Sequence, residues 1–384
     1  MAPIPLGWLD FFCPSAVETK TSFTMKILNK WRVLMLGGVC FGLALLSGCS
    51  TPAPTAPKKF TFFPPPPDDP RIQFLTAFAG EAQMGRTRGF SDFVTGEKKT
   101  ANPLVKPYGL ALHDGKIYVC DTVAHNIEVF DLKKKRATYF EPQGEGKLRL
   151  PINISIDADG TRYVADTMRQ QVLIYAKDGT FVAAMGKKDE LKPSDVAITS
   201  DRLYITDLNN HAVKVFSKAD RKLLFAIPLD EKNDKEKLFL PSNLAVDNNG
   251  KRLLVSDTGA NRVQVYDLDG KYLRTIGQQG VAPGLFARPK GVAADRAGLT
   301  YVVDAATQVV QIFDAAGRLL LFFGQAGAST RGEVVLPAAV KVDYDHVNYF
   351  QKYVAPGYRC EYLILVTSQY GGQKVSVYGF LKKI

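Results

Sequence analysis

The sequence predicts an all-β protein: a six-bladed β-propeller whose blades each contain four antiparallel strands. Three observations lead to this prediction. Six segments begin with a proline and continue as a short apolar strand, and they recur 42 to 48 residues apart. Further short strands separated by Gly/Asp turns follow each of them, and four strands at this period are typical of propeller blades. The last repeat lacks its fourth strand, which a lone strand near the N-terminus can supply.

The proline-led segments define the first strand of each blade. They are PYGLALH at 107–113, PINISID at 151–157, PSDVAIT at 193–199, PSNLAVD at 241–247, PKGVAAD at 289–295 and PAAVKVD at 337–343. In five repeats a second strand ends in aspartate 14 to 16 residues after the proline, as in KIYVCD. A third strand such as NIEVFD, a turn such as LDG and a fourth strand such as KYLRTIG come next. Short apolar runs between turn residues are typical of antiparallel strands.

The two ends of the repeat region predict how the ring closes. The last repeat has strands AVKVDYD, EYLILVTS and KVSVYGF and then stops at Ile384. The segment RIQFLTAFAG, at 71–80, resembles the other fourth strands and has no blade of its own. We expect this N-terminal strand to pair with the last blade, which would remove an open sheet edge. The propeller is therefore predicted to span residues 71–384.

The chain upstream of residue 71 is predicted to contain targeting and tether segments that lie outside the folded domain. Lys26, Lys30 and Arg32 precede an uncharged apolar stretch of 14 residues, 33–46, which suits a signal peptide and is too short to span a bilayer. We assign residues 25–48 to this signal and residues 1–24 to a superfluous start extension. Residues 49–70 are rich in proline and are predicted to form an extended tether.

The end of the signal, Leu46-Ser47-Gly48-Cys49, resembles the lipobox of bacterial lipoproteins. The resemblance implies that the thiol of Cys49 carries a diacylglycerol and that cleavage precedes this cysteine. It also implies a lipid-anchored protein of the bacterial cell envelope, and Ser50 is compatible with sorting to the outer membrane. The alternative is an ordinary secretory signal with an incidental cysteine.

From Pro107 to the C-terminus, the residue pattern of the repeats resembles that of the NHL family. The segments PKGVAADRAGLTYVVDAATQVVQIFDAAGRLLLFFG and DTGANRVQVYDLDGKYLRTIG fit its pattern closely. One enzyme branch of the family, a peptide-amidating lyase, holds zinc with histidines that follow the blade proline. No histidine follows that proline in any of the six repeats here, so no metal, cofactor or catalytic residue is expected from the resemblance.

Two sets of repeated polar residues receive a structural interpretation. The first set closes the second strands and is expected to accept backbone N–H bonds; it comprises Asp121, Asp166, Asp207, Asp257 and Asp304. The second set comes four residues later and is expected to hydrogen-bond within its blade, because its members interchange at one position. It comprises His125, Gln170, His211, Asn261 and Gln308. Zinc ligation by the histidines is not expected.

Polar residues near the start of the first strands converge at one mouth of the propeller channel. They are Tyr108, Asn153, Ser194, Asp195, Ser242, Asn243 and Lys290. These pore-mouth residues could hold a structural cation, water or a polar ligand. The alternative is a solvated channel lining without a ligand.

Two insertions interrupt the repeat and are candidate partner surfaces. Residues 81–106 contain Arg86, Arg88, Phe90 and Phe93 and are expected on the pore-mouth face. Residues 344–362, the tyrosine-rich insertion, contain Tyr349, Phe350 and Tyr353 and are expected on the opposite face, beside the basic turn 133–136. Aromatic side chains beside cations are typical of protein interfaces. The alternative is that these aromatics pack on their own blades.

Together these features favour a non-enzymatic binding or scaffold module in the cell envelope, with a protein or glycan as its partner. The alternative is an envelope enzyme, a lyase or hydrolase, with a site at the pore face. The net charge of +11 is compatible with acidic partners or lipid head groups. Nucleic acid is not an expected partner, because the lipobox implies export. Cys120 and Cys360 are expected to be free thiols, since the repeat alignment places them far apart.

Overall fold

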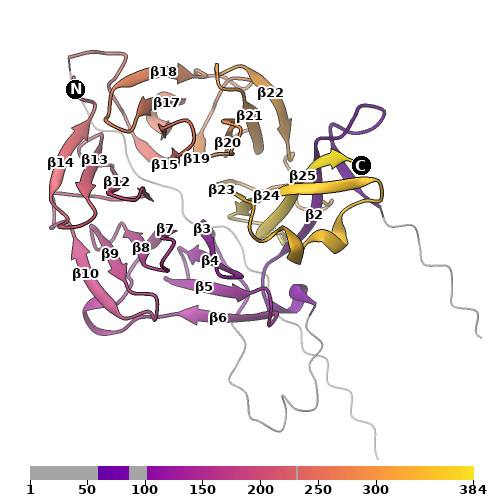
Figure 1. Ribbon diagram of the computed structural model, residues 1–384, viewed down its shortest axis with the longest axis horizontal. Coiled ribbons are helices and arrows are strands. Elements are labelled where there is room, and N and C mark those ends of the chain that lie inside the picture. Colours follow the sequence, from indigo (N-terminus) through magenta and orange to yellow (C-terminus); the bar gives the residue numbers. More distant parts are fainter. Residues whose placement is uncertain (1–58, 86–101, 231) are drawn as a thin grey trace, which may run out of the picture. The chain divides into compact units, whose positions relative to one another are not determined.

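The computed structural model describes residues 59–85, 102–230 and 232–384. Six antiparallel sheets stand around a central axis, with the first strand of each sheet innermost (Figure 1). The predicted six-bladed propeller is confirmed. The predictions for residues 1–24, for residues 25–48 and for Cys49 concern positions outside the described residues.

The first three blades follow one another along the chain. Blade one contains β3 (Pro107–His113), β4 (Lys116–Asp121), β5 (Asn126–Asp131) and β6 (Arg136–Phe140). Blade two contains β7 (Pro151–Ile156), β8 (Arg162–Asp166), β9 (Gln171–Tyr175) and β10 (Phe181–Met185). Blade three contains β11 (Val196–Ile198), β12 (Arg202–Asp207), β13 (Ala212–Ser217) and β14 (Leu223–Ile227).

The last three blades repeat this order, and the sixth also recruits strands from the N-terminal side. Blade four contains β15 (Pro241–Asp247), β16 (Arg252–Asp257), β17 (Arg262–Asp267) and β18 (Tyr272–Ile276). Blade five contains β19 (Pro289–Ala294), β20 (Thr300–Asp304), β21 (Val309–Phe313) and β22 (Leu319–Phe323). Blade six contains β23 (Pro337–Asp343), β24 (Tyr358–Ser368), β25 (Val375–Lys383), β2 (Ile72–Phe78) and β1 (Thr61–Phe63).

Five short 3-10 helices occur between the described strands. They are η1 (Glu81–Met84), η2 (Gly144–Gly146), η3 (Thr258–Ala260), η4 (Val347–Tyr349) and η5 (Gln351–Tyr353). In the described part of the chain, no helix has the length and apolar character needed to cross a membrane.

The strand register confirms the repeat alignment read from the sequence. In blades one, two, four and five the blade proline pairs with the aspartate that ends the second strand, as in Pro107↔Asp121 and Pro289↔Asp304. In blade six Ser368 takes the place of this aspartate opposite Pro337. Cys120 and Cys360, the cysteines of the described residues, are free, as predicted, and both are buried.

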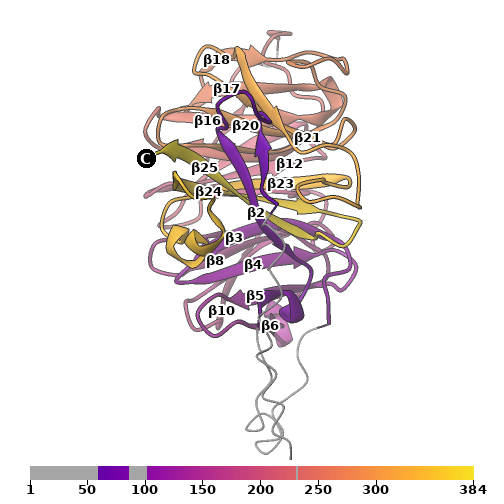
Figure 2. The same cartoon turned by 90° about the vertical axis from the view of Figure 1, so that its right-hand side faces the viewer.

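The ring closes as predicted, through the N-terminal strand. Strand β2 pairs antiparallel with β25, from Ile72↔Phe380 to Phe78↔Val375. Figure 2 shows this indigo strand beside the yellow C-terminal strands. Leu75 and Phe78 of β2 then pack with Phe130 in the core between blades six and one. The two ends of the propeller are therefore joined by both hydrogen bonds and apolar contacts.

The predicted boundary between tether and propeller is wrong by about ten residues. Residues 61–63, assigned to the tether, form β1 and pair with β2 as a fifth strand of blade six. The reason is aromatic packing, because the Phe63 ring lies 6.1 Å from the Phe323 ring and 6.3 Å from the Tyr378 ring. Buried aromatic side chains contribute strongly to packing energy, and the proline-rich composition around them hid this strand.

Candidate functional site

The repeated aspartates anchor backbone, as predicted. Asp121 accepts hydrogen bonds from the backbone N–H groups of Val105 (2.6 Å) and Lys106 (3.2 Å), which lead into its blade. It also accepts 3.0 Å bonds from Val123 and Ala124 in the following turn. A buried carboxylate with several backbone donors is satisfied where it stands. These residues are therefore structural.

The residues four positions after these aspartates, from His125 to Gln308, were expected to hydrogen-bond within their own blades. All five have left-handed backbone φ angles between 52° and 59°. His125 Nδ1 lies 2.5 Å from the carbonyl oxygen of Arg149, and Gln308 Oε1 accepts a 3.2 Å bond from the N–H of Leu336. Both partners belong to the connector that enters the next blade. The expectation of bonds within one blade was therefore wrong for His125 and Gln308, because a connector group lies within hydrogen-bond reach of each side chain.

Several pore-mouth residues join the innermost strands of neighbouring blades. Asn153 Nδ2 donates a 3.0 Å bond to the carbonyl oxygen of Ser194, and Ser194 Oγ donates a 2.7 Å bond to that of Ser242. All three side chains are buried. At Gly109 a Cβ would lie only 1.9 Å from Asn153 Oδ1, so the close approach of these strands requires glycine.

Asp195 is the buried carboxyl at the centre of this group. It accepts bonds from the N–H groups of Leu244 (3.0 Å) and Val196 (2.8 Å). Burial raises the pKa of Asp195 to about 6, and the charge of Lys341 opposes this rise. Tyr108 donates a 3.3 Å bond to Oδ1 of Asn243, which ties blade one to blade four. Burial, together with the charge of Asp195, raises the pKa of Tyr108.

Lys290 is the remaining pore-mouth residue, and burial lowers its pKa, with the charge of Arg288 adding to the effect. In the described ranges no group of three or more His, Cys, Asp or Glu side chains is arranged to hold a metal ion. The polar groups of Asn153, Ser194, Asp195 and Ser242 already have partners. These partners are backbone groups and the side chains of Thr206, Asn243 and Thr258. A cation or small ligand at the pore mouth stays a prediction.

The tyrosine-rich insertion forms a second site, between blades six and one. It folds as η4 and η5, and its backbone is held by Gln73 of β2. Gln73 Nε2 donates a 2.8 Å bond to the carbonyl oxygen of Tyr353, and its Oε1 accepts a 3.0 Å bond from the N–H of Ala355. The insertion is thus fixed to the strand that closes the ring.

A histidine fixes the other side of this insertion. His346 Nδ1 lies 2.9 Å from Asp343 Oδ2, and Nε2 accepts a 2.9 Å bond from the N–H of Gly115 in blade one. The Asp343 carboxylate raises the pKa of His346, although burial opposes this. The ring of Tyr349 stacks 6.2 Å from that of His346. Tyr349 remains 37% exposed, whereas Phe350 is buried.

These elements line an open cavity of about 140 Å³, which we call the aromatic–lysine cleft. It is lined by Thr76, Phe78, Gln83, Met84, Leu132, Lys135, Tyr349, Phe350, Lys352 and Tyr353. The sequence identified Tyr349, Phe350, Tyr353 and the basic turn, but not Gln83 and Met84. Nothing in the local pattern of η1 distinguishes those two as lining residues.

The position of η1 corrects one expectation about the first insertion. Its described beginning was expected on the pore-mouth face, yet it lies against the basic turn of blade one. Glu81 accepts a 2.9 Å bond from the N–H of Ala137, and Lys135 Nζ lies 3.5 Å from the carbonyl oxygen of Gly85. The proposed partner residues Arg86, Arg88, Phe90 and Phe93 lie outside the described residues.

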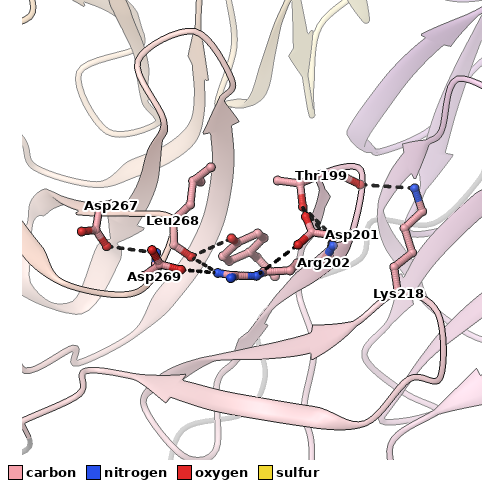
Figure 3. Close-up of polar contacts among 8 residues, drawn as sticks. Thr199, Asp201, Arg202, Lys218, Asp267, Leu268 and Asp269 are labelled. Carbon is pink, nitrogen blue, oxygen red and sulfur yellow. Dashed lines mark hydrogen bonds and ion pairs between the residues drawn. The ribbon is translucent and has the colours of Figure 1, made fainter.

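Hydrogen bonds also connect the turn between β11 and β12 of blade three with the turn between β17 and β18 of blade four (Figure 3). Arg202 Nη1 donates bonds to the carbonyl oxygen of Leu268 (2.8 Å) and to Asp269 Oδ1 (2.7 Å). Tyr204 also donates a 2.8 Å bond to the Leu268 carbonyl oxygen. Lys218 donates a 3.2 Å bond to the carbonyl oxygen of Thr199. The bonds of Arg202 and Tyr204 hold the turns of these adjacent blades in fixed relative positions, whereas the Lys218 bond lies within blade three.

Comparison with known proteins agrees with this architecture. A family model described as a 6-bladed beta-propeller matches residues 227–379, and an NHL repeat model matches residues 191–216. The chain is a six-bladed β-propeller that contains a match to the NHL repeat. The protein brain tumor of Drosophila melanogaster is 30% identical over 160 residues, which cover 41% of this chain and 14% of that protein. The B-box type zinc finger protein ncl-1 of Caenorhabditis elegans is 30% identical over 156 residues, which cover 40% of this chain and 17% of that protein.

Solved propellers share the fold at low sequence identity. A streptogramin B lyase structure is 14% identical with a TM-score of 0.52, and the match covers 73% of this chain and 95% of the lyase chain. A gluconolactonase from Xanthomonas campestris is 14% identical with a TM-score of 0.53, covering 85% and 98%. At this identity the likeness concerns the fold. The matched part spans less than a fifth of the two animal relatives.

Proposed function

We propose that this β-propeller is a non-enzymatic binding module of the bacterial cell envelope, anchored to the outer membrane through lipid on Cys49. Its partner is a protein, and the aromatic–lysine cleft is the surface that it presents. The observation that carries the proposal is the composition of this cleft. It combines a half-exposed tyrosine, a buried apolar floor and two lysines, on segments that the fold holds in place.

The polar residues at the repeated positions hydrogen-bond backbone groups, which supports a role in binding over one in catalysis. Asp121 and its counterpart Asp304 accept several backbone N–H bonds, and His125 bonds a backbone carbonyl. A catalytic acid or base must instead reach the reacting group of a substrate. These side chains are committed to holding connectors, so we assign them no chemical step.

Lipid anchoring rests on Leu46-Ser47-Gly48-Cys49 and is tested by Cys49→Ala in intact cells. The parent protein should fractionate with membranes and carry acyl chains by mass spectrometry, because several chains on one residue give stable anchoring. The variant should remain unprocessed or be released. Unchanged processing and membrane retention of the variant would refute the anchor.

The partner surface is tested by cross-linking in cells followed by affinity purification. Tyr349→Ser should lose the cross-linked partner, since exposed aromatic residues carry much of the binding energy of an interface. Tyr370→Ser is the matched control, because Tyr370 is also exposed but lies in the turn after β24, away from the cleft. Equal recovery of partners by both variants would contradict the assignment of this surface.

A further inference from the structure

The size of the aromatic–lysine cleft limits what can enter it. Its cavity of about 140 Å³ is close to the roughly 150 Å³ that accommodates a benzene molecule. Phe78, Leu132 and Phe350 contribute its apolar lining, and Phe78 and Phe350 are buried. A cavity of this volume accommodates one aromatic or branched aliphatic side chain.

The charges around this cavity have one sign. Lys135 and Lys352 line it, and no Asp or Glu does among the described residues. Lys135 Nζ reaches only the Gly85 carbonyl oxygen, at 3.5 Å, and Lys352 Nζ lies 4.9 Å above the ring of Tyr353. Neither ammonium has a carboxylate partner in the described part of the chain. Both remain available to an anionic group of a partner.

The cleft is already formed without a partner. Its walls come from β2 and η1, from the basic turn of blade one, and from η4 and η5. Gln73 and His346 hold the wall formed by η4 and η5. Gln73 uses both atoms of its amide, and His346 uses both ring nitrogens. A preformed pocket binds a side chain at a lower entropic cost than one that must be ordered.

We propose that the aromatic–lysine cleft binds an acidic segment of a protein partner, which inserts one bulky apolar side chain between Lys135 and Lys352. The proposal rests on the proposed function and deepens it by naming the chemistry of the partner. The apolar side chain supplies affinity by burial. The flanking carboxylates of the segment pair with the two lysines and select it over neutral sequences.

The test measures binding of fluorescent peptides to the purified full chain at low ionic strength. The probe is acetyl-Asp-Glu-Phe-Glu-Asp-amide, with Phe changed to Ala in one control and the four acids changed to their amides in another. Loss of the phenyl group should weaken binding by about tenfold or more. Loss of the four charges should weaken it by about fivefold or more, and added salt should weaken the charged probe alone.

Protein variants separate the two contributions. Lys135→Gln with Lys352→Gln should weaken binding of the acidic probe about fivefold and leave the amide probe unaffected. Lys188→Gln with Lys271→Gln, two exposed lysines elsewhere, is the charge-matched control and should change nothing. Leu132→Trp should block the cavity while keeping both lysines. Melting curves establish that each variant is folded.

Several results would overturn the proposal. These are absence of probe binding at millimolar peptide, equal binding of acidic and amide probes, or equal loss in both lysine pairs. Binding of a neutral chitotriose that competes with the acidic probe would assign the cleft to a glycan. If the peptides fail but Tyr349→Ser still loses its cellular partner, the surface stands and only its proposed chemistry falls.

Discussion

Replacing Gln73 with leucine should destabilise the propeller at the seam between blades six and one. Gln73 is 1% exposed and lies on the strand that closes the ring. Its amide bonds the carbonyl oxygen of Tyr353 at 2.8 Å and the N–H of Ala355 at 3.0 Å, some 280 residues away in sequence. Leucine has a similar size but can make neither bond.

The expected loss follows from the groups left behind. A buried donor or acceptor without a partner costs about 1–3 kcal/mol. Two such groups, the Tyr353 carbonyl and the Ala355 N–H, give a loss of roughly 2–6 kcal/mol. The shape of the side chain is nearly kept, so no large cavity adds to this cost. The tyrosine-rich insertion should also loosen, because these two bonds hold its second half.

Urea unfolding, followed by circular dichroism, measures this loss as a shift in midpoint at constant slope. Gln143→Leu is the control, because Gln143 is exposed and should change stability by less than about 0.5 kcal/mol. Hydrogen exchange should rise in residues 344–357 for Gln73→Leu and not for the control. If Gln73→Leu unfolds at the parent midpoint with unchanged exchange, the amide does not hold the insertion.

Three further predictions concern closure, thiols and pH. Deleting residues 71–80 should open the ring and cost more than a single core truncation, which costs about 2–5 kcal/mol; a deletion that melts like the parent contradicts closure by β2. Cys120 and Cys360 should resist alkylation when folded and react fully in urea, since burial raises both thiol pKa values, that of Cys360 to about 12; rapid native labelling by mass spectrometry would contradict it. The pKa of Asp195 is raised to about 6 in the fold, so its protonated carboxyl contributes stability below pH 4. This contribution is lost as the pH rises through 6. The parent should therefore lose up to roughly 3 kcal/mol relative to Asp195→Asn between pH 4 and 7, and parallel stability curves would refute this.

The candidate sites were only partly accessible from the sequence. The repeat alignment identified Asp121 and its equivalents as backbone anchors, because one residue type at one repeat position implies one local role. It identified the chemistry of Tyr349, Phe350 and the basic turn, but not their meeting with Met84. It also missed the bond from His125 to the next connector, since that bond depends on where the carbonyl oxygen of Arg149 lies in the folded chain.

The sequence by itself determined the propeller, because strand periodicity and turn residues are local signals that recur in six copies. It also determined closure by β2, since one unpaired strand and one incomplete blade have a single solution. The tertiary structure decided what meets across the seam: β1 on blade six, Gln73 on the insertion, and η1 beside the basic turn. Those contacts depend on the relative placement of segments up to about 280 residues apart, and the patterns within each segment carry no information about such placement.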